Sequence, residues 1–87
     1  MSIRVELTYD MSKALGTSRF EVEGAHSVRD VVRLTRERFG ADSASFERLT
    51  RTAALAVNGV LMNHRKGLKT PLRDGDRVTF LKAAAGG

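Results

Sequence analysis

The sequence predicts an α+β fold in two layers, a mixed sheet of four to five strands packed against one main helix. Short segments near both ends alternate apolar and polar residues, as strands with one buried face do. One longer segment between them repeats its apolar residues at helical spacing. Glycine-containing turns separate these segments. With 87 residues, of which 41% are hydrophobic, the chain has material for one small core.

The first two strands are predicted as a hairpin. Residues 3–9 read "IRVELTY" and alternate with period two, so one face of this strand should be buried. The inward residues are Ile3, Val5, Leu7 and Tyr9. Gly16 forms the turn, and the second strand, 19–23, places Phe20 and Val22 inward. The turn is expected to connect the two strands directly.

The segment 28–39 is predicted to be the main helix. Ser27 is its N-cap, Asp30 reaches back to complete a capping box, and Gly40 ends the helix. Its apolar side consists of Val28, Val31, Val32, Thr35 and Phe39, with Leu34 at the margin. The helix also supplies the crossover that a parallel strand pair requires. A short helix is expected within 41–52.

The second half of the chain supplies the remaining strands. A strand through Leu55 and Val57 turns at Asn58-Gly59 and continues to Met62, because this dipeptide is the typical two-residue hairpin turn. Arg65 to Lys69 form a basic connection, Leu72 anchors the chain, and a tight turn spans 74–76. In the last strand Val78 and Phe80 should face inward. Arg77, Thr79 and Leu81 should face outward.

Composition removes several classes of function. Without cysteine the chain has no disulfide, iron–sulfur cluster or Cys-based zinc site. No segment reads as a signal peptide or a membrane span, so a cytoplasmic protein without membrane contact is expected. The net charge of +5 suits an acidic protein surface, a nucleic acid, or simply a solvated surface. A nucleic-acid partner is disfavoured because no aromatic stacking platform accompanies the basic residues.

No group of residues forms a catalytic constellation. His26 and His64 lie far apart in the predicted fold, and each is expected to be a turn residue. Asp74 and Asp76 flank Gly75 and are expected to serve the turn rather than acid catalysis or metal binding. We therefore expect a protein that is not an enzyme and binds no metal and no cofactor.

Two motifs carry a family resemblance: "LAVNG" at 55–59 and "LRDGDRVTFLKAAAGG" at 72–87. The sequence resembles the ubiquitin-like sulfur carriers, which include the small subunit of molybdopterin synthase and the thiamine-pathway carrier. The resemblance implies a β-grasp domain over 1–82 and a flexible tail over 83–87. The length of the segment 40–52 favours the molybdopterin-synthase type, while thiamine, cysteine and tRNA thiolation are alternatives.

The resemblance also implies a role for each end residue. Gly87 would be adenylated by an enzyme similar to the ubiquitin-activating type, which consumes ATP, and then converted to a thiocarboxylate. A cysteine desulfurase or rhodanese would donate the sulfur, and an acceptor synthase subunit would receive it. Gly86 and Gly87 lack a Cβ, so they can pass close to a partner's walls. Leu81 is a candidate docking residue, together with Thr79 and Met62.

Two alternatives remain open. Gly87 could instead form an isopeptide bond with a lysine, which would make the protein a modifier. The chain could also be a basic β-grasp domain that binds RNA or protein, with its terminal glycines incidental. The fate of the acyl group distinguishes the carrier from the modifier, and a strong salt dependence would support the binding domain.

Overall fold

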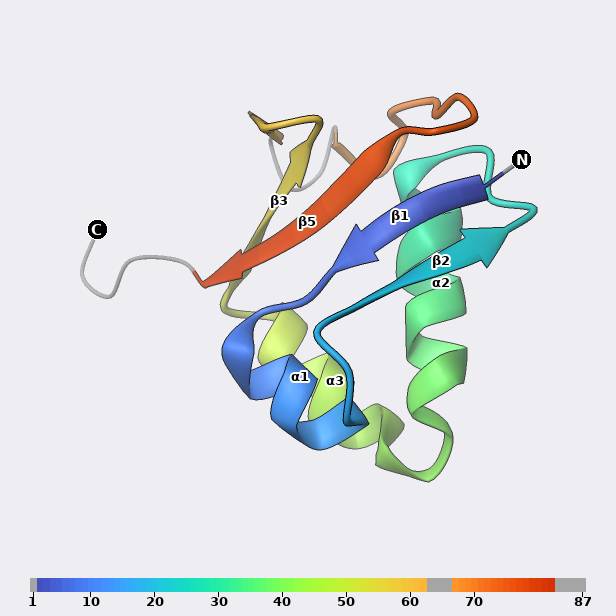
Figure 1. Ribbon diagram of the computed structural model, residues 1–87. Helices are drawn as coiled ribbons and strands as arrows, with labels where there is room; N and C mark the ends of the chain where they lie inside the picture. The colour runs from blue at the N-terminus through green and yellow to red at the C-terminus, as the bar shows by residue number, and fades with distance from the viewer. Residues whose placement is uncertain (1, 63–66, 83–87) are drawn as a thin grey trace.

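The computed structural model describes residues 2–62 and 67–82. Five strands form one sheet, and the helices cover one of its faces (Figure 1). The strands are β1 (Ser2–Glu6), β2 (Arg19–Glu23), β3 (Ala53–Val57), β4 (Val60–Met62) and β5 (Arg77–Lys82). The helices are α1 (Tyr9–Leu15), α2 (Val28–Phe39), the 3-10 turn η1 (Gly40–Asp42) and α3 (Ser43–Thr50). This is the α+β arrangement that the sequence predicts.

The sheet has the strand order β2-β1-β5-β3-β4. The pair β1 and β5 is parallel, whereas the other three neighbouring pairs are antiparallel. The first and last described strands therefore lie side by side at the centre of the sheet, as Figure 1 shows. The main helix lies in the connection between the two halves of the sheet, as the crossover argument predicts.

The prediction for residues 7–18 is wrong in one respect. The antiparallel pair β1 and β2 forms, but a helix replaces the expected direct turn. Thr8 Oγ1 accepts a hydrogen bond from the backbone N–H of Met11 at 3.1 Å, which begins α1. Gly16 ends it in the left-handed conformation, at φ 86°. Tyr9 is thus a helix residue with 74% of its surface exposed, and Met11 enters the core instead.

The core lies between the sheet and α2. Its sheet residues are Ile3, Val5, Phe20, Val22, Leu55, Val57, Val78 and Phe80. The helix α2 contributes Val28, Val31, Thr35 and Phe39, as its spacing predicts. The predicted short helix is α3, and its Phe46 packs between Phe39 and Phe80, at ring-centroid distances of 5.0 and 5.9 Å. Burying a phenylalanine stabilises the fold by about 1.5–3 kcal/mol, so α3 is fixed to the core.

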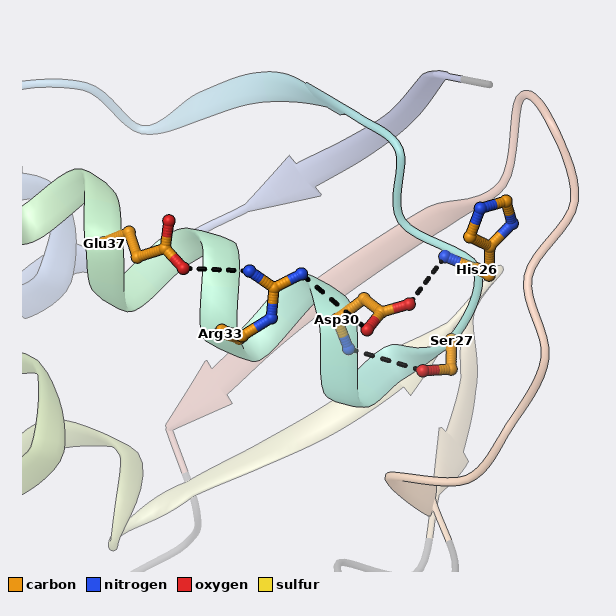
Figure 2. Close-up of polar contacts among 5 residues, drawn as sticks. All are labelled: His26, Ser27, Asp30, Arg33 and Glu37. Carbon is orange, nitrogen blue, oxygen red and sulfur yellow. Dashed lines mark hydrogen bonds and ion pairs between the residues drawn. The ribbon is translucent and has the colours of Figure 1, made fainter.

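The N-terminus of α2 is capped as predicted by Ser27, with one difference (Figure 2). Ser27 Oγ accepts a hydrogen bond from the backbone N–H of Asp30 at 3.4 Å. Asp30 reaches back one residue further than a capping box requires, and accepts from the backbone N–H of His26 at 2.9 Å. This hydrogen bond lowers the pKa of Asp30. Desolvation of the carboxylate raises the pKa in part, and the positive charge of Arg33 lowers it further. His26 therefore acts as a turn residue, through its backbone.

Candidate functional site

The candidate site is the end of the sheet where the C-terminal tail begins. Lys82 is the last described residue, at the end of β5, so the predicted site residues Gly86 and Gly87 lie outside the described residues, as does the predicted tail 83–87. Because β1 and β5 are parallel, β5 ends at the end of the sheet where β1 leads into α1 (Figure 1). Lys82, the last described residue, consequently lies beside residues 7–10.

Thr79 and Leu81 lie on the open face of the sheet, the face that no helix covers. Alternate strand residues point to opposite faces, and the intervening Phe80 is buried under the helices. Leu81 has 40% of its surface exposed. Thr79 is half-buried, and its Oγ1 donates a hydrogen bond to Glu6 Oε1 at 2.8 Å. The same Glu6 oxygen lies 3.6 Å from Arg77 Nε, so this carboxylate joins two strands.

Met62 lies on the other face. It pairs with Leu55, which in turn pairs with Phe80, and directly opposite residues share a face of the sheet. Met62 packs against the core from the helix side, where Thr70 Oγ1 lies 3.6 Å from its Sδ. Gly67 approaches so closely that an added Cβ would lie 2.7 Å from Met62 Cβ. The structure therefore brings Thr79 and Leu81 together but does not place Met62 with them.

Leu61 occupies the position beside Thr79 and Leu81 that was expected for Met62. It pairs with Ala56, and Ala56 pairs with Thr79. Its side chain is 65% exposed, and Ala54 opposes Leu81 in the next row of the same face. We name Ala54, Leu61, Thr79 and Leu81 the open-face patch. The two-residue turn already fixes this register, because it makes Val57 face Val60 and therefore Ala56 face Leu61.

The opposite end of the sheet holds the turn residues of the two sequence motifs. Asn58 Nδ2 donates to Asp76 Oδ1 at 3.0 Å, and Asn58 Oδ1 accepts from the backbone N–H of Arg77 at 2.9 Å. Asp74 Oδ1 accepts from the backbone N–H of Ser2 at 2.7 Å. Asp74 and Asp76 thus stabilise turns, as predicted. β5 separates them from the tail by six residues, about 20 Å at the usual rise per strand residue.

Hydrogen bonds hold the carboxylate of Asp76 in its turn. The pKa of Asp76 is lowered, first by the backbone N–H of Arg73 and then by the Asn58 amide, which keeps the carboxylate charged. In residues 2–62 and 67–82, no three His, Asp or Glu side chains are close enough to hold a metal ion. His64 lies outside the described residues. No helix in this part of the chain is long and apolar enough to cross a membrane.

Comparison with known proteins shows which family of proteins this chain matches and which solved structures share its fold. The model of the ThiS family matches residues 8–87, which includes the tail. The small archaeal modifier protein 1 of Methanosarcina acetivorans is 25% identical, with a TM-score of 0.78, over 99% of this chain and 96% of that one. A chain of the BexX/CysO complex of Amycolatopsis orientalis is also 25% identical, with a TM-score of 0.71, over 98% and 99%.

A third structure shares the fold. The complex of subunits 1 and 2 of the molybdopterin-converting factor from Helicobacter pylori contains a chain with 22% identity and a TM-score of 0.68, over 100% of both chains. Comparison with curated protein sequences gave no match. The solved structures confirm the β-grasp topology that the sequence motifs imply.

Proposed function

Since the chain belongs to the ThiS family of ubiquitin-like sulfur carriers, we propose that it carries sulfur as a thiocarboxylate on Gly87. The observation that supports this most directly is the family match, which extends through the terminal Gly86-Gly87. Proteins of this family are carriers, and catalysis belongs to their partners. The protein is accordingly a cosubstrate and not an enzyme.

The proposed chemistry takes place at the terminal carboxylate. An oxygen of Gly87 attacks the α-phosphorus of ATP on the activating enzyme, and pyrophosphate leaves. The terminal sulfur of a persulfide, supplied by a cysteine desulfurase or rhodanese type of donor, then bonds to the carbonyl carbon as the acyl–phosphate bond breaks and AMP leaves. A thiol of the donor or of the activating enzyme cleaves the S–S bond of the resulting acyl disulfide, which releases the thiocarboxylate and leaves a disulfide on the enzymes. The product passes its sulfur to an acceptor subunit, and addition of water restores the carboxylate. The carrier itself would bind no cofactor, and the reactions would take place in the cytoplasm.

The open-face patch is the proposed docking surface for these enzymes. Leu81 is exposed directly before the tail, and Thr79 and Leu61 continue the same surface across β5 and β4. An apolar surface at the start of the tail would orient Gly87 toward a buried site. Five residues, 83–87, span at most about 16 Å when extended, so the enzyme must bind close to this end of the sheet.

The pathway we favour is that of molybdopterin synthase, in which this chain would be the small subunit. The segment after α2 forms η1 and α3, and Phe46 of α3 is buried in the core. The similarity in fold to the chain from the Helicobacter pylori molybdopterin-converting factor supports the same choice. Thiamine, cysteine and tRNA thiolation would use the same thiocarboxylate and are the alternatives within this function.

A protein-modifier function is the second candidate. It is favoured by the 25% identity to the small archaeal modifier protein 1 over almost the whole chain. Adenylation of Gly87 is common to both functions, but in a modifier the acyl group would form an amide with a lysine ε-amine. The third candidate, a basic domain that binds RNA or protein, requires no chemistry at Gly87.

Intact mass spectrometry of the protein from its own cells tests the proposal. Replacement of one oxygen by sulfur at Gly87 is the expected result, and a Gly87–lysine linkage would favour the modifier. Deleting Gly86 and Gly87 should leave the fold intact and abolish adenylation, whereas an Ala83→Ser variant keeps both glycines and should be modified normally. Sulfuration of the truncated chain by ATP, the activating enzyme and the donor would disprove the proposal.

A further inference from the structure

A small pocket opens on the helix side of the molecule, on the face of the sheet opposite the open-face patch. Its volume is about 110 Å³. The residues that line it are Val32, Thr50, Ala53, Leu55, Leu68 and Phe80. They come from α2, α3, β3, β5 and the turn after Gly67, so five separate segments meet there.

The pocket suits one aliphatic side chain. Apart from the Thr50 hydroxyl, its lining side chains are apolar. An apolar cavity of about 150 Å³ is large enough to hold benzene, so the smaller volume here accommodates a leucine or isoleucine side chain. Burying such a side chain contributes about 1.5–3 kcal/mol, enough for a docking contact but not for a stable complex by itself.

Cationic residues lie beside this pocket. Arg29 precedes Val32 by three residues and so lies on the same side of α2. The backbone N–H of Arg29 donates to the carbonyl of Leu68 at 2.9 Å, which brings Lys69 close to Arg29. Arg29 and Lys69 are exposed, and neither forms an ion pair with another residue in the described part of the chain.

The acidic residue on the α3 side of the pocket already forms an ion pair. Glu47 lies one turn before Thr50 in α3, but its Oε1 is 3.0 Å from Arg36 Nη1. Arg36 lies one turn after Val32, whereas Arg29 lies one turn before it, so this ion pair joins α2 to α3 away from Arg29. Arg29 and Lys69 therefore leave positive charge beside the pocket that no ion pair in the described part of the chain offsets.

We propose that this pocket binds an acidic segment of a partner protein, which inserts one aliphatic side chain and places flanking carboxylates near Arg29 and Lys69. A single-stranded RNA is a poorer fit, because the lining residue Phe80 is buried and offers no exposed ring for base stacking. The pocket and the open-face patch lie on opposite sides of the sheet, so both can be occupied at once. This inference does not depend on sulfur transfer at Gly87.

A titration followed by NMR tests the inference. The labelled full-length chain is titrated with a short acetylated peptide that carries one leucine between two runs of glutamate. Saturable shifts should centre on Val32, Ala53 and Leu68, and should vanish when serine replaces the leucine. Lys69→Glu should weaken binding about fivefold or more, because it reverses a charge beside the peptide. Arg48→Glu makes the same charge change at an exposed position two residues from Thr50, and should change affinity less than about twofold.

A second variant keeps the test independent of charge. Ala53→Leu fills the pocket from within and should abolish the shifts, while the unbound spectrum shows whether the variant folds. Equal weakening by Lys69→Glu and Arg48→Glu would overturn the proposal, as would binding of the serine peptide with unchanged affinity. The proposal would also fail if a short RNA, and not the peptide, shifted the pocket residues.

Discussion

Asn58 and Asp76 are joined by a hydrogen bond of 3.0 Å that connects the β3–β4 turn to the turn before β5. Asn58 also adopts φ 50° and accepts from the backbone N–H of Arg77. With Gly59 at φ 84°, both central residues of the hairpin turn are left-handed, as a type I′ turn requires. One side chain therefore fixes the turn and its position relative to β5.

Replacing Asn58 should destabilise the fold without changing the residues of the tail that carry the proposed chemistry. Asn58→Gly keeps the left-handed conformation but loses both side-chain hydrogen bonds, and should lower the free energy of unfolding by about 1–3 kcal/mol. Urea unfolding gives this value. Asn58→Ala should cost more, because it adds backbone strain. Equal stability of Asn58→Gly and the unaltered protein would show that these hydrogen bonds contribute nothing.

The lowered pKa of Asp76 predicts a loss of stability in acid. A carboxyl whose pKa is lower in the folded than in the unfolded protein stabilises the fold above the unfolded value, which is about 3.9. This contribution is lost as the pH falls from there through the lowered pKa. Urea midpoints measured between pH 6 and pH 2.5 should therefore fall less in Asp76→Asn than in the unaltered protein.

A control for this pH effect is available at another aspartate. Asp42 lies in η1, is exposed, and its side chain forms no hydrogen bond or ion pair in the described part of the chain. Asp42→Asn should leave the pH dependence of the urea midpoint unchanged. If Asp76→Asn behaves in the same way as Asp42→Asn, the hydrogen bonds to Asp76 do not stabilise its charged form.

Sequence patterns predicted the strands from their alternation with period two, and α2 from its helical spacing and its N-cap. The alternation of β5 places Val78 and Phe80 in the core, and Ser27 begins α2 where the motif indicates. The structure of residues 7–18 was harder to predict, because the alternation of apolar and polar residues continues through Leu7 and Tyr9, past the end of β1. The cap Thr8 and the stop Gly16 were visible signals of a short helix, but the alternating pattern outweighed them.

The candidate docking residues show a different limit of prediction from sequence. Leu81 follows from the strand alternation alone, whereas the choice between Leu61 and Met62 depends on register across the hairpin. Counting outward from the turn at Asn58-Gly59 would have selected Leu61. The pocket beside Val32 and Leu68 could not be predicted, because it forms where five segments meet.

The buried hydroxyl of Thr35 predicts a stabilising substitution. Thr35 is fully buried, and its Oγ1 is the buried side-chain polar atom that has no hydrogen-bond partner in the described part of the chain. Thr35→Val replaces the hydroxyl with a methyl group of similar size, and should raise the free energy of unfolding by about 0.5–2 kcal/mol. A decrease in urea or thermal unfolding experiments would mean that the hydroxyl is satisfied in solution.

The open-face patch predicts a loss of activation without a loss of fold. Leu81→Asp places a charge on an exposed apolar surface directly before the tail, and should lower the kcat/KM for adenylation by the activating enzyme about tenfold or more. Leu61→Asp should have a smaller effect in the same direction, since it lies two strands from β5. Both variants should retain the urea midpoint within experimental error, because their side chains contribute little to the core.

Val60→Asp provides the matched control for this docking surface. Val60 is also exposed and apolar, but it pairs with Val57 in a row whose residues point toward the helix side of the sheet. Its substitution should leave kcat/KM within about twofold of the unaltered protein, because it removes no part of the patch. If Val60→Asp and Leu81→Asp reduced adenylation equally, the enzyme would recognise general surface hydrophobicity, and the open-face patch would not be its docking site.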